Sequence, residues 1–351
     1  MIMRKVLLGL LLCKACFAGI EDHLISSQEV RVAQSTHLEG WLDDYNEAQK
    51  LAEKKNLPLL IAFLGPNWCP WSDKLEAEVL TRTSFLSSLE KEVVFLKVDI
   101  PEHYDQEAEQ NHPSLPLKER YFVDECPSLV LASPNGKEIA KLEYLPISST
   151  DFAGTIKEML SDYEKLVALT EKKELKHLKS DELQTLYTKA GRLADETIKK
   201  SLLKQGLKID SGPYFLLEKY GERLASGKVT SRKSRSIRKK IEALDPENAA
   251  GSQRKLAIMD FEALKTTLTP NHNAKVAIQP ILQYLQKFGP KDRDHTWKLQ
   301  MKVSQYLFGK NEVEEALKHA KLSLEAAPQS AHAEINQSIE YLLTHLEIKS
   351  E

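Results

Sequence analysis

The sequence predicts an α/β domain followed by an all-helical domain. Two continuous apolar runs, LPLLIAFL (57–64) and VVFLKVDI (93–100), have the composition of strands buried on both faces of a sheet. Amphipathic segments with apolar residues three and four apart lie between and around them, which is typical of helices that cover such a sheet. No strand pattern follows residue 170, where helical periodicity continues to the end of the chain.

A change in charge balance supports two domains. Residues 19–165 hold 14 Lys and Arg against 27 Asp and Glu, whereas residues 166–351 hold 32 against 24. A shift of this size between halves indicates a boundary near residues 165–175. The expected divisions are a signal peptide (1–18), an N-terminal extension (19–37), an α/β domain (38–165) and a helical domain (170–351).

The first helix of the α/β domain is expected over residues 38–56. It carries apolar residues on one face and ends before Pro58. The strand at 57–64 follows, then a turn and a helix that begins near Ser72. The second buried strand, at 93–100, comes next.

The rest of the domain is expected to form a hairpin between two helical segments. A short helix should precede Pro113 in a polar stretch of the chain. Residues 126–143 predict two strands joined at Asn135-Gly136, a strong signal for a tight turn. The closing helix should begin at a Ser or Thr around residues 148–150, because these side chains cap helix N-termini.

The N-terminus has the three parts of a secretory signal. Arg4 and Lys5 supply positive charge, a short apolar run follows, and Ala18 suits cleavage. The run is too short to span a bilayer; a buried N-terminal strand is the alternative. We expect an exported protein, periplasmic or secreted and cut after Ala18, whose mature chain keeps the cysteines Cys69 and Cys126.

Consecutive helices with short breaks in the C-terminal half predict an array of helical hairpins. Residues 297–329 resemble a tetratricopeptide repeat. Ala316 stands at the expected helix crossing, Ser323 at the next small position and Pro328 after the second helix. In the first helix of the repeat, the expected small residue is matched only by a serine, Ser304. Concave helical arrays commonly bind proteins, so a partner surface or a homodimer is expected here.

The chemistry of the sequence centres on GPNWCPWSDKL (65–75). Cys69 stands where a buried strand ends and a helix begins, and Pro70 suits the first helical position. Free backbone N–H groups at such a helix start stabilise a thiolate, which is the nucleophilic form of cysteine. Trp68 and Trp71 are expected to form an apolar rim. The alternative is a small buried cysteine among packing aromatic rings.

This segment resembles the active-site strand, turn and helix of thioredoxin-like proteins, which carry W-C-x-x-C. The sequence CPSLVLASPNGKEIAKL resembles the second landmark of that family, a proline in the cis form followed by a hairpin; here it would be Pro127. The resemblance covers residues 38–165. It implies a thioredoxin-like fold and a substrate groove formed by Trp68, Pro70, Trp71, Ser72 and Pro127.

Three positions depart from the family pattern. Asp73 suits the first helical turn, but its charge would oppose a nearby thiolate. Ser72 replaces the second cysteine, so the motif cannot form its usual disulfide, and a dithiol enzyme uses that sulfur to release its substrate. Phe63 stands where thioredoxins often keep a buried acid. A monothiol site still permits isomerisation, because a substrate thiol can resolve the mixed disulfide.

Cys126 precedes the landmark proline, and in the family this position faces the reactive cysteine. It has three interpretations: a resolving thiol in place of Ser72, a partner in a disulfide with Cys69, or a small apolar residue of the groove. Net oxidation or reduction of a client would require Cys126 or an external thiol.

The sequence therefore predicts an exported thiol–disulfide oxidoreductase or isomerase with Cys69 as nucleophile and Cys126 as a second thiol. Its partners would be cysteine-containing exported proteins and a thiol reductant or redox protein. The alternative is a non-catalytic binding scaffold in which Cys69 is vestigial. No cofactor or metal site is expected, because no histidine, cysteine and carboxylate cluster has ligand spacing.

A basic stretch, KVTSRKSRSIRKK (228–240), lacks the interleaved aromatic residues typical of nucleic-acid binding. We expect no nucleic-acid partner. The stretch is interpreted as a solvated helix face, with docking on an acidic partner, including the acidic half of this chain, as the alternative.

Overall fold

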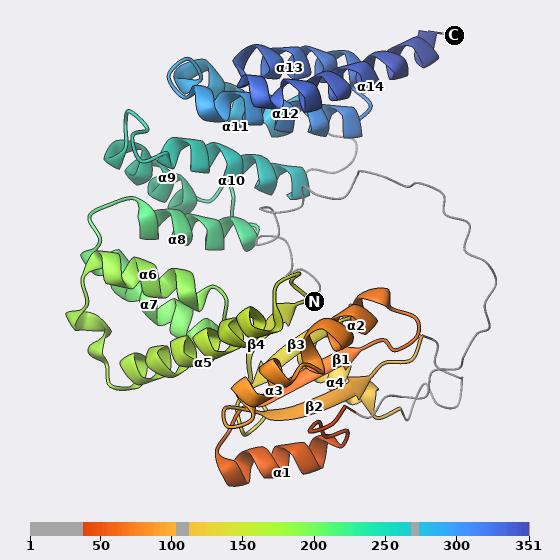
Figure 1. Cartoon of the computed structure of the whole chain (residues 1–351). Coiled ribbons are helices and arrows are strands. Elements are labelled where there is room, and N and C mark those ends of the chain that lie inside the picture. Colours follow the sequence, from red (N-terminus) through yellow and green to blue (C-terminus); the bar gives the residue numbers. More distant parts are fainter. Residues whose placement is uncertain (1–37, 103–111, 268–273, 351) are drawn as a thin grey trace, which may run out of the picture. The chain divides into compact units, whose positions relative to one another are not determined.

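The computed structural model describes residues 38–102, 112–267 and 274–350 (Figure 1). The chain divides into two compact units between Ile209 and Asp210. The expected signal peptide, the N-terminal extension and the helix before Pro113 lie outside the described residues. None of the helices in the described ranges is both long and apolar enough to span a membrane.

The first unit contains a mixed sheet of four strands. They are β1 (Leu59–Leu64), β2 (Val94–Asp99), β3 (Ser128–Ala132) and β4 (Glu138–Glu143), in the order β2-β1-β3-β4. Strand β1 pairs parallel to β2 and antiparallel to β3, and β4 completes the predicted hairpin. This sheet and the helical region after it confirm the predicted fold class.

Helices cover both faces of the sheet (Figure 1). One apolar cluster joins a face of the sheet to α2 (Pro70–Leu75), the π-helix η1 (Glu76–Leu80), α3 (Thr83–Leu89) and α5 (Ser149–Glu171). The second cluster joins the opposite face to α1 (Tyr45–Lys55) and α4 (Ser114–Tyr121). The cap of α5 is Ser148, whose side chain accepts a hydrogen bond from the Asp151 N–H.

Helix α1 begins later than the periodicity predicts. Asp44 caps it by accepting a hydrogen bond from the Glu47 N–H at 2.8 Å. Before the cap, the backbone of Leu42 pairs with the edge strand β2: its N–H donates to the Phe95 carbonyl, and its own carbonyl accepts from the Lys97 N–H. The predicted start at residue 38 is wrong because this segment is used to extend the sheet.

The first unit extends through α6 (Ser180–Ala190) and α7 (Glu196–Ile209). The loop between them is bonded to the sheet: the Ala194 N–H donates to the Ile139 carbonyl at 2.7 Å, and Lys137 pairs with Asp195 at 2.6 Å. The unit thus ends later than the boundary that the charge balance indicates, because packing and hydrogen bonds extend beyond the acidic stretch.

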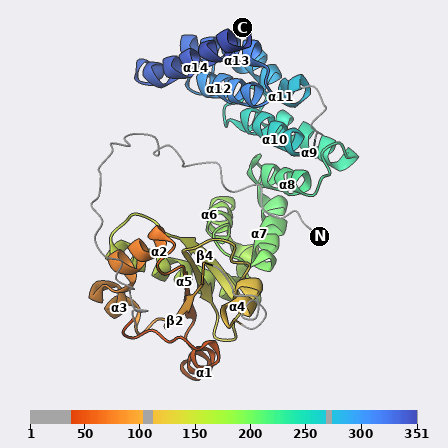
Figure 2. The ribbon, with the colours of Figure 1, turned by 90° about the vertical axis from the view of Figure 1, so that its right-hand side faces the viewer.

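The second unit consists of helices in the residues that the structure describes (Figure 2). They are α8 (Tyr214–Ala225), α9 (Arg232–Leu244), α10 (Ser252–Thr267), α11 (Ala274–Phe288), α12 (Arg293–Gly309), α13 (Val313–Ala326) and α14 (His332–Ser350). Between α12 and α13, Ala316 is fully buried, Ser304 donates to its carbonyl at 2.8 Å, and Ser323 donates to the Trp297 carbonyl at 2.7 Å. Small residues therefore allow this pair of helices to approach closely.

Asp195 should contribute to stability in a pH-dependent way. Burial alone would raise the pKa of Asp195, but hydrogen bonds from Lys137 and from the N–H groups of Ile198 and Thr197 hold it below its ordinary value. Asp195→Ala should lower the free energy of unfolding by about 1–2 kcal/mol at pH 7. The contribution is present above the unfolded pKa, about 3.9, and is lost as pH falls through the lower folded value.

Urea unfolding at pH 7, 4 and 3 measures this effect, because the contribution is lost only below the unfolded pKa of about 3.9. Glu164→Ala, which removes an exposed carboxylate from the middle of α5, is the matched control and should change stability by less than about 0.5 kcal/mol. An Asp195→Ala deficit that grows on acidification would contradict the assignment.

Candidate active site at Cys69

Cys69 lies at the turn between β1 and α2. It is the N-cap residue of α2, with extended backbone angles, and Pro70 is the first residue of the helix. The Cys69 N–H donates to the Gly65 carbonyl at 2.9 Å, while its own carbonyl accepts from the N–H groups of Ser72 and Asp73. The backbone on both sides of Cys69 is thus hydrogen-bonded, which fixes the cysteine at the carboxyl end of β1.

Ser72 holds the turn together. Its buried hydroxyl accepts a hydrogen bond from the Gly65 N–H at 2.9 Å. Gly65 must be glycine, because a Cβ there would lie 2.5 Å from the Trp68 ring. From the sequence, Ser72 was interpreted only as the loss of a cysteine, and this hydrogen bond was not predicted. A serine seven positions after a glycine, across a tight turn, could have indicated it.

The structure brings Cys69 and Cys126 together from distant parts of the chain. The Cys69 thiol donates to the Cys126 carbonyl, with Sγ and O 3.2 Å apart. The peptide bond between Cys126 and Pro127 is cis. Both cysteines are free thiols; Cys69 is 7% exposed and Cys126 is half-buried.

Burial and, to a smaller extent, the charge of nearby Cys69 raise the pKa of the Cys126 thiol, and Lys118 partly opposes both effects. Together they bring this pKa to about 11. Cys126 is therefore almost entirely protonated at neutral pH, and a protonated thiol is a poor nucleophile.

The two tryptophans beside Cys69 have different environments. Trp68 is half-buried against the face of the sheet that α1 and α4 cover, and its Nε1 donates to the Ile100 carbonyl at 2.7 Å. Trp71 is 56% exposed, and its ring lies 6.0 Å from that of Tyr144, with the Lys74 ammonium 5.5 Å from it. Trp71 and Tyr144 thus form the aromatic surface beside the thiol.

Among the other groove residues, Pro70 is exposed and Pro127 is half-buried. Tyr144 was not identified from the sequence, although it directly follows the last strand of the hairpin. Its hydroxyl donates to Glu78 at 2.6 Å, which fixes the ring over the segment that follows α2.

The strand before Cys69 carries no acid. Phe63 is fully buried and its ring packs against that of Tyr121, 6.3 Å away between centroids. Charged side chains lie instead on β2. Buried Lys97 forms ion pairs there, with its Nζ 3.5 Å from a Glu76 carboxylate oxygen and 3.3 Å from an Asp99 carboxylate oxygen. Burial raises the pKa of Asp99, and Lys97 partly offsets that rise.

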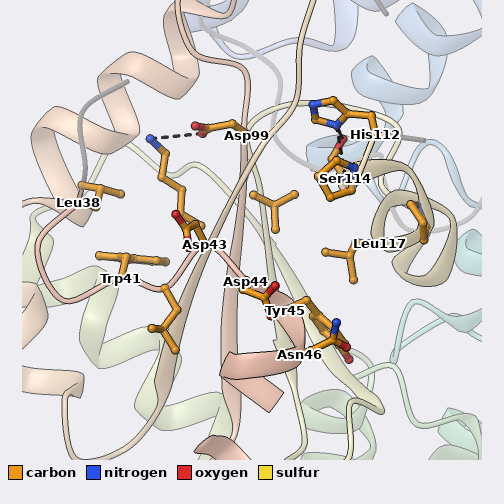
Figure 3. Close-up of a pocket in the computed structure, with 15 residues that line it drawn as sticks. Leu38, Trp41, Asp43, Asp44, Tyr45, Asn46, Asp99, His112, Ser114 and Leu117 are labelled. Carbon is orange, nitrogen blue, oxygen red and sulfur yellow. Dashed lines mark hydrogen bonds and ion pairs between the residues drawn. The ribbon is translucent and has the colours of Figure 1, made fainter. Parts of the chain in front are cut away.

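A cavity of about 540 Å³ lies at the end of β2 and the start of α1 (Figure 3). Its lining includes Trp41, Asp43, Asp99 and His112, but neither cysteine. The Cys69 thiol is therefore outside this cavity. No group of three or more His, Cys, Asp or Glu side chains in the described ranges is arranged to hold a metal ion.

The fold and the position of Cys69 define a thioredoxin-like domain. The thioredoxin-like domain family matches residues 45–160 of the chain. The thioredoxin-related protein DsbJ of Chlamydia pneumoniae is 28% identical over 307 residues, which are 86% of this chain and 87% of the relative. This similarity extends past the thioredoxin-like domain into the helical unit.

Other similar proteins match a smaller part of the chain. The disulfide bond reductase DsbH of Chlamydia pneumoniae is 26% identical over 133 residues, 38% of this chain and 79% of the relative. A solved structure of DsbH oxidoreductase is 24% identical, with a TM-score of 0.31 over 38% of this chain and 95% of that one. A thioredoxin from Thermus thermophilus is 21% identical, with a TM-score of 0.26 over 36% and 87%.

Ser72→Ala should destabilise the protein, because it leaves the Gly65 N–H without its buried acceptor. The expected loss is about 1–3 kcal/mol in the free energy of unfolding, measured in urea. Ser87→Ala, at an exposed position of α3, is the control and should be nearly neutral. Equal stability of the two variants would show that the Ser72 hydroxyl does not hold the turn.

Alkylation of Cys126 should be slow at neutral pH and should accelerate about tenfold per pH unit between pH 7 and 10, because the thiolate fraction rises in that proportion below a pKa of about 11. Peptide mapping by mass spectrometry after timed iodoacetamide pulses measures Cys126 separately from Cys69. The urea-unfolded chain is the control and should react as an ordinary thiol. A rate that levels off below pH 9 contradicts the burial effect.

Proposed function

We propose that this protein is an exported thiol–disulfide oxidoreductase that acts chiefly as an isomerase, with Cys69 as its nucleophile. The supporting observation is the position of Cys69 at the strand–helix turn, with its Sγ 3.2 Å from the carbonyl of Cys126, the residue before Pro127. The relatives named for disulfide reduction and for a thioredoxin relationship are consistent with this chemistry. Export is inferred from the N-terminal sequence pattern.

In the first step the Cys69 thiolate attacks one sulfur of a client disulfide. A bond forms between Cys69 Sγ and that client sulfur, the client S–S bond breaks, and the other client sulfur leaves as a thiolate. Exposed Trp71, with half-buried Tyr144 beside it, offers an aromatic surface against which the client can pack. The contact between Cys69 and the Cys126 carbonyl must open for the sulfur to reach the client.

In the second step a client thiolate attacks the mixed disulfide at the client sulfur. A new client disulfide forms and the Cys69 thiolate leaves, so no electrons are gained or lost overall. Ser72 cannot supply a resolving sulfur, and its hydroxyl is occupied by the Gly65 N–H. Cys126 is protonated at neutral pH and resolves slowly. Client thiols or an external thiol reductant therefore end the cycle.

Cys69→Ser should abolish the isomerisation of a scrambled disulfide client, whereas Cys126→Ser should keep most of it, since client thiols and not Cys126 resolve the intermediate. Both rates are measured by recovery of client activity in a glutathione buffer. Acid quenching followed by mass spectrometry should detect a mixed disulfide on Cys69 in the wild type and in Cys126→Ser.

Two outcomes would contradict the proposal. Complete loss of activity in Cys126→Ser would make Cys126 the resolving thiol and the protein a dithiol enzyme. Client capture that survives Cys69→Ser, with no isomerisation by the wild type, would instead support the non-catalytic binding scaffold.

A further inference from the structure

Helix α9 carries a dense set of positive charges. Residues 228–240 contain seven Lys and Arg and no Asp or Glu. Five of these cations on α9 are exposed, and together they are called the cationic face: Arg232, Lys233, Arg235, Lys239 and Lys240. At 100° per residue they lie within an arc of about 160°, so a single side of the helix presents all five.

The opposite side of α9 is fixed to the protein. Ile241 is fully buried in an apolar cluster with residues of α8 and α10, beside which the helix lies (Figure 1). Ser234 is also buried; it donates to the Lys228 carbonyl at 2.6 Å and accepts from Arg223 at 2.9 Å. Arg238, at the border, pairs with Glu242 and Asp260. The cationic face is thus held toward solvent.

The five cations make no ion pair with any carboxylate in the described parts of the chain. Lysines elsewhere in the same unit do: Lys219 pairs with Glu222, and Lys265 and Lys302 both pair with Glu262. The mutual repulsion of the cationic face is therefore not relieved from within the unit, and an anionic partner would relieve it.

The composition of the cationic face distinguishes between kinds of anionic partner. Cores of protein–protein interfaces are enriched in aromatic residues and depleted of lysine. The cationic face has three lysines and no aromatic residue. Ile237 and Ile241 on the apolar side of α9 already pack against α8 and α10, and Leu244 is the exposed apolar residue left at its end. This is too little apolar surface for α9 to insert between lipid tails as an amphipathic helix does. The composition of the cationic face therefore favours electrostatic attraction to an extended negative surface over a protein interface or insertion into lipid.

We propose that the cationic face of α9 docks the protein on a membrane surface rich in anionic phospholipid. The contact is electrostatic and peripheral, made by lysine and arginine side chains to headgroup phosphates. It is separate from the thiol chemistry of Cys69, and would concentrate the protein at a membrane that none of its described helices spans.

Vesicle co-sedimentation tests this proposal with the full-length mature protein. Vesicles of phosphatidylglycerol and phosphatidylcholine are compared with vesicles of phosphatidylcholine alone, in 0.1 M and then in 1 M NaCl. The wild type should bind only the anionic vesicles and only at low salt, because 1 M salt screens charge within about 3 Å. The triple variant Lys233→Gln, Lys239→Gln, Lys240→Gln should partition about 100-fold more weakly.

The matched control removes three exposed lysines from other helices and loops of the same unit: Lys298→Gln, Lys310→Gln, Lys321→Gln. It has the same net charge as the triple variant and should bind nearly as well as the wild type. Circular dichroism establishes that both variants are folded.

Three results would overturn the proposal. Equally weak vesicle binding by the control variant would show that net charge, and not the cationic face, causes binding. Binding of the wild type to neutral vesicles would show that the attraction is not electrostatic. Binding to polyglutamate or to DNA without binding to anionic vesicles would assign the face to an acidic protein or a nucleic acid.

Discussion

Burial of β1 on both faces is the constraint on which the first unit depends. All six residues, Leu59–Leu64, are apolar and inaccessible to solvent. Such a strand must be central, so β2 and β3 pair on its two sides and helices cover both faces. The carboxyl end of β1 then emerges beside the start of β3. Cys69 and Cys126 meet there across 57 residues of sequence, and the candidate site is a direct consequence of where this strand lies.

Short-range sequence patterns predict those elements whose formation depends on residues close together in the chain. The apolar runs predict β1 and β2, Asn135-Gly136 predicts the hairpin, and Ser148 is within the expected capping range. The late start of α1 has a local signal that periodicity does not include, because Asp44 caps the helix, and the hydrogen bonds between Leu42 and β2 accompany it. The attachment of α6 and α7 could not be predicted, because it depends on a hydrogen bond from Ala194 to a strand far away in sequence.

The candidate site divides in the same way. The position of Cys69 between strand and helix follows from the sequence, because both elements have clear local patterns. The directions of the tryptophans do not. Trp68 turns inward because its Nε1–H donates to the Ile100 carbonyl, while Trp71 is exposed beside Tyr144 and Lys74. The structural role of Ser72 could not be predicted by comparing it with the cysteine that it replaces, since the hydrogen-bond partner of its hydroxyl is a backbone N–H.

Neither Ser72 nor Cys126 readily supplies a second thiolate beside Cys69 at neutral pH. A second sulfur at position 72 would give up a good oxygen acceptor for the Gly65 N–H, so the turn and a dithiol mechanism compete for one side chain. Cys126 is close enough to Cys69 for their charges to interact, but burial keeps it protonated. In the proposed mechanism, intramolecular release by Cys126 is therefore slow at neutral pH. A slow release would leave a client attached long enough for its own thiols to attack, which would favour isomerisation over net reduction.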